Sequence, residues 1–81
     1  MTDTNEINKR IAEKVGRKEV IAAELGISLA SLNNKIANRT EFKASEISTL
    51  QKMLGLSDIE VFRIFFKSKV SHYDTLGVVN G

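Results

Sequence analysis

Apolar residues recur every four positions along the first part of the chain, which is the spacing of an amphipathic helix. Within residues 4–15 these are Ile7, Ile11 and Val15. Asp3 or Thr4 can cap the start of this segment with a side-chain oxygen, and Gly16 can end it because glycine readily adopts a left-handed conformation. The pattern therefore predicts a first helix with one narrow apolar stripe.

Two further amphipathic helices, over residues 18–25 and 28–37, are separated by a short turn. Gly26 stands where the first of them ends, and Ser28 can cap the second by accepting a hydrogen bond from a backbone N–H. The small side chain of Ala22 allows the two helix backbones to approach closely. This pattern is typical of a helix-turn-helix, whose second helix enters the major groove of DNA. A helical hairpin without any role in nucleic-acid binding is the alternative.

The helix over residues 28–37 divides into two sides when its residues are placed about 100° apart. Leu32 and Ile36 share the side that we expect to face the core, and Ala30 and Asn34 lie opposite them. Asparagine can pair with adenine through two hydrogen bonds, and a small apolar side chain can contact a thymine methyl group. We therefore expect base contacts from residues of the outer side and its flanks: Leu29, Ala30, Ser31, Asn33 and Asn34. The alternative is that the two asparagines are only solvated.

Residues 44–54 form a predicted fourth helix, whose apolar positions follow the same spacing. The loop before it contains one large apolar residue, Phe42, which we expect to pack into the core. A fifth helix opens with a capping box, in which Ser57 is the cap and Glu60 stands three residues later. The sequence therefore predicts an all-α domain of five helices over residues 1–70.

The fifth helix has more apolar residues than one buried face requires. One group consists of Ile59, Phe62 and Phe66, and the other consists of Val61, Ile64 and Phe65. Since only one group can belong to the core, the second must be covered by something else. We expect Val61, Ile64 and Phe65 to form an interface with a second copy of the chain or with another partner.

The last residues, 71–81, lack helical spacing, so we expect a short irregular tail that is loosely ordered or used in association. If the tail folds back, Val70, Tyr73 and Leu76 could cover the fifth helix instead of a partner chain. A partner chain would bring two copies of the helix over residues 28–37 to half-sites one turn of DNA apart. We therefore expect a homodimer, at least on DNA.

The formal net charge of the 81-residue chain, +2, is too small by itself to indicate a nucleic-acid partner. Basic residues are nevertheless concentrated before and at the start of the predicted motif: Lys9, Arg10, Lys14, Arg17 and Lys18. Others flank the helix over residues 28–37 and the loop after it, where the DNA backbone would pass. We expect phosphate contacts from Arg17, Lys18, Ser28, Lys35, Arg39 and Lys43. A solvated basic surface is the alternative interpretation of the first cluster.

The composition argues against several other classes of protein. The chain has no cysteine, so it can form neither a disulfide nor a cysteine zinc site. Its one histidine, His72, has no further metal-ligating residues evident near it in the sequence. No apolar run reaches the length of a membrane span and nothing resembles a signal peptide, so we expect a cytoplasmic protein. We also expect no cofactor, no small-molecule ligand and no enzymatic activity. A catalytic set of nucleophile, base and orienting group would need the one histidine, which lies in the tail.

Three stretches resemble the small Cro-like helix-turn-helix proteins of temperate phages and prophages of Gram-positive bacteria: KEVIAAELGIS, SLNNKIANRTEFKASEI and LGLSDIEVFRIFF. They cover most of residues 7–66 and look particularly like a phage family often left without an assigned function. The resemblance implies a lambda-repressor-like DNA-binding fold of five helices and transcriptional regulation, as by a repressor, at a double-stranded DNA operator. This chain departs from the family pattern at three places. It has Lys18 where family members commonly have Gln near the start of the second helix, and Ala37-Asn38 where they often have Asn-Gly after the third. It has Leu29-Ala30 where they commonly have polar or basic base-contacting residues early in the third helix.

A protein-binding module on the same scaffold is the competing hypothesis. A phage helix-turn-helix protein could act as an antirepressor or modulator that binds a phage repressor protein instead of an operator. The apolar pair Leu29-Ala30 and the excess apolar surface of the fifth helix favour this alternative. The two hypotheses differ in salt dependence, because the release of counterions makes DNA binding weaken steeply as salt rises.

Overall fold

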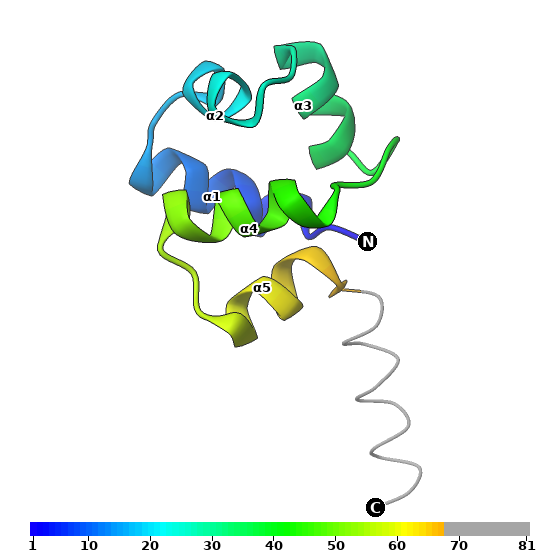
Figure 1. Cartoon of the computed structure of the whole chain (residues 1–81). Helices are drawn as coiled ribbons and strands as arrows, with labels where there is room; N and C mark the ends of the chain where they lie inside the picture. Colours follow the sequence, from blue (N-terminus) through cyan, green and yellow to red (C-terminus); the bar gives the residue numbers. More distant parts are fainter. Residues whose placement is uncertain (68–81) are drawn as a thin grey trace, which may run out of the picture.

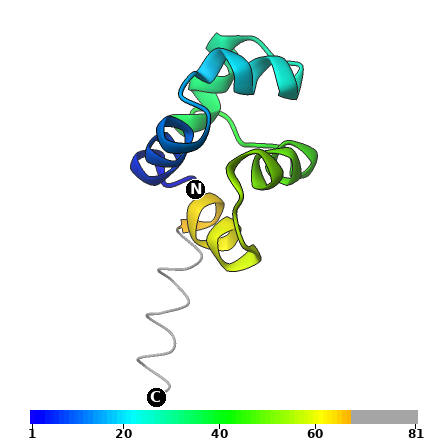
Figure 2. The same cartoon turned by 90° about the vertical axis from the view of Figure 1, so that its left-hand side faces the viewer.

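The computed structural model of the chain describes residues 1–67, which form five α-helices and no β-strand. The helices are α1 (Thr4–Lys14), α2 (Lys18–Leu25), α3 (Leu29–Ile36), α4 (Ala44–Leu54) and α5 (Asp58–Phe65). α1 and α4 occupy the middle, α2 and α3 lie together at one end, and α5 lies at the other end (Figure 1, Figure 2). The predicted all-α architecture of five helices is confirmed. Within residues 1–67, no helix is both long enough and apolar enough to cross a bilayer.

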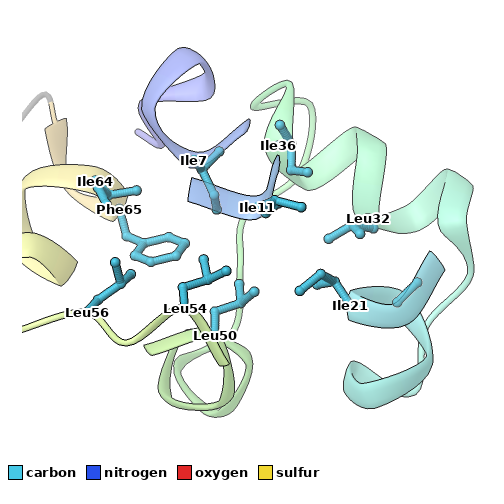
Figure 3. Packing of buried hydrophobic residues seen from close by; sticks show 11 residues of the cluster. Ile7, Ile11, Ile21, Leu32, Ile36, Leu50, Leu54, Leu56, Ile64 and Phe65 are labelled. Atoms are coloured by element: carbon cyan, nitrogen blue, oxygen red, sulfur yellow. The ribbon is translucent and has the colours of Figure 1, made fainter. Parts of the chain in front are cut away.

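One hydrophobic core joins the five helices. In its middle, Ile7 and Ile11 of α1 and Leu50 and Leu54 of α4 are all buried. Figure 3 shows further members on either side of this centre. On the side of α2 and α3 they are Ile21, Ala22, Leu32 and Ile36. On the side of α5 they are Leu56, Ile64 and Phe65.

The first and last of these helices, α1 and α5, are capped as the sequence predicts. At α1, Asp3 Oδ1 accepts a hydrogen bond from the Glu6 N–H at 3.2 Å. At α5, Ser57 Oγ accepts from the Glu60 N–H at 3.1 Å, and the Glu60 carboxylate accepts from the Ser57 N–H at 2.9 Å. These caps satisfy backbone donors that would otherwise be unpaired at the ends of the helices.

α5 turns a different face to the core from the one expected. Ile64 and Phe65 are only 2% and 4% exposed, so the prediction that they form an interface with a partner is wrong. Val61, the third residue of that prediction, is half-buried and packs against the core. Ile59 and Phe62 are instead 64% and 43% exposed. The physical reason is that α5 packs on α1 and α4 through the side that carries Ile64 and Phe65.

Phe42 fills the core from the loop between α3 and α4, as predicted. Its ring is half-buried and meets the ring of Phe65 edge-on, with the two centroids 5.4 Å apart. Such edge-to-face contacts are a favourable arrangement of aromatic rings. The predicted tail over residues 71–81, and the alternative cover of α5 by Val70, Tyr73 and Leu76, lie outside the described residues.

The first three residues connect the loop after α3 to the end of α5. The Thr2 N–H donates to Asn38 Oδ1 at 2.7 Å, and the Thr2 carbonyl accepts from Asn38 Nδ2 at 2.9 Å. The Asp3 N–H donates to the Ile64 carbonyl at 2.6 Å. Asn38 has a φ of 66°, a left-handed conformation that asparagine tolerates better than most residues. One side chain therefore fixes both the turn after α3 and the N-terminal segment.

Two substitutions of Asn38 test this connection. Asn38→Gly keeps the left-handed turn but loses both side-chain hydrogen bonds, so we expect the free energy of unfolding to fall by about 1–2 kcal/mol. Asn38→Ala loses the same bonds and adds left-handed strain, so we expect it to be less stable by about 1 kcal/mol more. Urea denaturation measures both values. Wild-type stability in Asn38→Gly would contradict the connection, and equal stability of the two variants would contradict the role of the backbone conformation.

Candidate nucleic-acid interface

α2 and α3 are joined by a tight turn. α2 ends at Gly26, whose φ is 70°, and the Gly26 and Ile27 N–H groups donate to carbonyl groups in the last turns of α2. Ser28 then starts α3, since its Oγ accepts a hydrogen bond from the Ser31 N–H at 3.0 Å. The chain therefore ends one helix and begins the next within three residues, which is the connection that a helix-turn-helix uses.

α3 is anchored along one side. Leu32 and Ile36 are buried, and Leu32 points toward Ile21 of α2 (Figure 3). The opposite side bears small or uncharged side chains that face solvent. These are the exposed residues Leu29, Ala30 and Asn33, with Ser31 half-buried on the flank. A helix surface of this kind can enter a major groove and contact base edges without a charge in its centre.

Asn34 is less accessible than its position on the helix suggests. It is half-buried, and its Oδ1 accepts a hydrogen bond from Arg39 Nη1 at 3.0 Å. The turn after α3 brings Arg39 back toward the helix, because the Arg39 N–H donates to the Asn34 carbonyl at 2.9 Å. The two side chains therefore lie together at the C-terminal end of α3, with Arg39 exposed.

Lys35 is not available to a DNA phosphate. It is only 7% exposed, and its Nζ lies 2.9 Å from Glu46 Oε1 of α4 and 3.2 Å from the Glu41 carbonyl. The prediction of a phosphate contact at Lys35 is wrong, because leaving a buried carboxylate without its cation is strongly unfavourable. Lys35 instead ties α3 to α4.

The same arrangement keeps Glu46 ionised. Burial alone raises the pKa of Glu46, but the Lys43 N–H, at 2.8 Å, and the Lys35 ammonium together outweigh burial. The pKa of Glu46 therefore lies below its ordinary value. A lowered folded-state pKa means that this carboxylate stabilises the fold above the ordinary glutamate pKa, and that the contribution is lost as the pH falls through the lowered value.

The other predicted phosphate contacts lie at the surface. Arg17 is exposed at the start of α2, and its Nε is 3.5 Å from Glu19 Oε2 in a solvent-exposed pair, which is a weak interaction. The start of α2 has no side-chain cap, so its first backbone N–H groups can receive an anion together with Arg17. Lys18 is half-buried, whereas Ser28 and Lys43 are exposed.

Arg10, a member of the basic cluster, is already paired. Its Nε lies 2.8 Å from Glu6 Oε2 and its Nη1 lies 2.7 Å from Glu60 Oε2. The hydrogen bonds with Glu6 and Glu60 raise the pKa of Arg10. The pKa of Glu60 is lowered, first by the hydrogen bond from the Ser57 N–H and then by the hydrogen bond from Arg10. Arg10 therefore joins α1 to α5. The spacing of four between Glu6 and Arg10 is a sequence signal for half of this network, whereas nothing in the sequence indicates Glu60.

No group of three or more His, Cys, Asp and Glu side chains among residues 1–67 could hold a metal ion. His72, the one histidine of the chain, lies outside the described residues.

Comparison with known proteins finds one family. A family model with the description "Protein of unknown function (DUF739)" matches residues 1–68, which include every described residue. No curated protein and no solved structure matches the chain.

The buried ion pair leads to a pH prediction. Glu46→Gln leaves Lys35 buried without its counter-charge, so we expect the free energy of unfolding at neutral pH to fall by about 3 kcal/mol. The difference from wild type should begin to shrink below about pH 4.3, where the carboxylate takes up a proton in the unfolded chain, and it should disappear as the pH falls through the lowered pKa of the folded state. Urea denaturation between neutral and acidic pH measures this, with Glu13→Gln, an exposed glutamate of α1, as the control that should change little. A difference that stays constant across the range would contradict the ion pair.

Proposed function

The chain belongs to the DUF739 family, whose description assigns no function, and we propose that it is a sequence-specific, double-stranded DNA-binding transcriptional regulator. In this proposal α3 is the recognition helix and lies in the major groove of an operator. The observation that supports it is the exposed, uncharged outer side of α3, presented by a helix-turn-helix turn and flanked by surface cations. The resemblance to Cro-like proteins favours a repressor encoded by a phage or prophage and acting in the cytoplasm.

The first two turns of α3 supply the base contacts. Recognition helices contact base edges mainly through their N-terminal residues, and in α3 these are the residues that face solvent. The exposed amide of Asn33 can pair with adenine N6 and N7, and Leu29 and Ala30 can contact thymine methyl groups. Ser31, on the flank, can donate or accept a single hydrogen bond. Specificity in this proposal rests on few direct hydrogen bonds and on shape.

Surface cations supply the phosphate contacts. They are Arg17, Lys18, Arg39 and Lys43, and the exposed hydroxyl of Ser28 can add a neutral contact. Lys35 takes no part, because it is held by Glu46. Four phosphate contacts correspond to a slope of about −3.6 in log affinity against log salt for each copy of the chain. We further propose that two copies bind together as a homodimer on DNA, so that one recognition helix reads each half-site.

An antirepressor or modulator that binds a phage repressor protein is the second candidate function. The observation that favours it is the exposure of Ile59 and Phe62 on α5, since large apolar side chains at a surface often mark a protein-binding site. α5 lies at the end of the domain opposite α3 (Figure 1). This candidate predicts capture of a repressor without affinity for duplex DNA.

Selection from a pool of random duplexes at two salt concentrations tests the DNA-binding proposal. We expect enrichment of a sequence with two related half-sites about 10 base pairs apart, and steep loss of binding at the higher salt. Fluorescence anisotropy with the selected duplex then gives the salt slope. Absence of enrichment at both salt concentrations, together with capture of a phage repressor, would favour the second candidate.

Replacement of Asn33 tests the assignment of base contacts. Asn33→Ala should cost about 1–3 kcal/mol in affinity for the selected duplex and should change little for a scrambled one, because the lost hydrogen bonds are base-specific. Asn5→Ala, an exposed asparagine of α1, is the matched control and should bind both duplexes like wild type. Equal loss on both duplexes would remove Asn33 from the base-reading residues.

A further inference from the structure

One contact separates Asn34 from the other outward-facing residues of α3. Its Oδ1 accepts a hydrogen bond from Arg39 Nη1 at 3.0 Å, whereas no such bond ties the side chains of Ala30 and Leu29, which are apolar. The backbone supports the same contact, because both the Arg39 and the Thr40 N–H groups donate to the Asn34 carbonyl, at 2.9 and 3.4 Å. Arg39 is therefore hydrogen-bonded to Asn34 through both its main chain and its side chain.

The turn that produces this return is fixed independently of Arg39. Asn38, the residue before it, has a φ of 66° and is held by two hydrogen bonds with the main chain of Thr2. The chain thus reverses direction at a defined residue directly after α3. The position of the Arg39 backbone is set by the fold, and only its long side chain needs a further restraint.

The contact uses the atom that base recognition would need. An asparagine that reads adenine accepts from N6 with its oxygen and donates to N7 with its NH₂ group. In Asn34 that oxygen already accepts from a guanidinium, and the side chain is half-buried. The Arg39 guanidinium has five N–H donors, and one of them donates to Asn34. The remaining donors, on an exposed residue, form a planar fork that can still bind a ligand. That fork matches the oxygens of a phosphate.

We propose that Asn34 is a positioning residue, which holds the guanidinium of Arg39 ready for a DNA phosphate and does not itself read a base. The inference rests on the proposed DNA binding and names a role within the same site. Its physical basis is that a long side chain held in advance loses less conformational freedom on binding. Such ordering costs correspond to about a two- to tenfold change in affinity for each side chain.

A double-mutant cycle with Asn34→Ala, Arg39→Ala and the double variant tests the proposal on the selected and scrambled duplexes. Arg39→Ala should weaken binding to both duplexes and should reduce the salt slope by about one. Asn34→Ala should weaken both about two- to tenfold in the presence of Arg39, and should have no further effect in its absence. A third variant, Asn34→Asp, keeps an acceptor for Arg39 but cannot donate to adenine N7. Because the proposal gives Asn34 no base contact, we expect this variant to keep the wild-type preference between the duplexes. Thermal melting should show all variants folded, since the hydrogen bond is exposed.

Two results would overturn the inference while the DNA-binding proposal stands. One is a change of preference at a single base pair in Asn34→Ala that persists in the Arg39→Ala background, which would make Asn34 a base reader. The other is strict additivity of the two substitutions, which would separate the two residues. Failure of the wild-type chain to bind any duplex would instead overturn the proposed function and this inference with it.

Discussion

α3 is held from one side, and this constraint determines which of its residues reach solvent. Leu32 and Ile36 are buried in the core, and Lys35 lies 2.9 Å from Glu46 of α4. Burial of apolar surface is not directional and tolerates some rotation of a helix, whereas a buried ion pair holds two particular atoms at a short distance. The two together fix the rotation of α3. Ala30 and Asn33 face outward as a consequence.

The loop after α3 is fixed by a second, polar constraint. Asn38 takes a left-handed conformation and exchanges two hydrogen bonds with Thr2, which in turn lies beside the end of α5 through Asp3 and Ile64. The fold therefore controls both the outer side of α3 and the residues that follow it. A surface that is held in advance loses less conformational entropy on binding than a flexible one, which is the property that a recognition surface needs.

The helices and their caps could be predicted from the sequence because their signals are local. Gly26 and Ser28 lie next to the helix ends that they define, and Ser57 with Glu60 forms a capping box within four residues. The errors concern side chains whose environment is set by another helix. Lys35 resembles a surface cation until Glu46, eleven residues away, is brought to it.

The same limit applies to the two apolar groups of α5. Periodicity shows that the helix has two apolar groups, but not which of them α1 and α4 will cover, and Ile64 and Phe65 prove to be the buried pair. The contact between Asn34 and Arg39 depends in turn on the left-handed turn at Asn38, which no local pattern indicated. The outer side of α3 was accessible to sequence reasoning because it follows from the anchoring residues of the same helix.

An NMR titration of the ¹⁵N-labelled chain with a selected duplex tests whether α3 binds DNA, because it reports which amides change environment when the duplex is added. We expect the largest shifts from Ser28 to Asn34 and at the start of α2, and we expect these shifts to disappear at high salt. Amides of α5 around Ile59 and Phe62 should change little. Shifts confined to α5, or an unchanged spectrum at low salt with every enriched duplex, would contradict the claim that α3 is the DNA-binding surface.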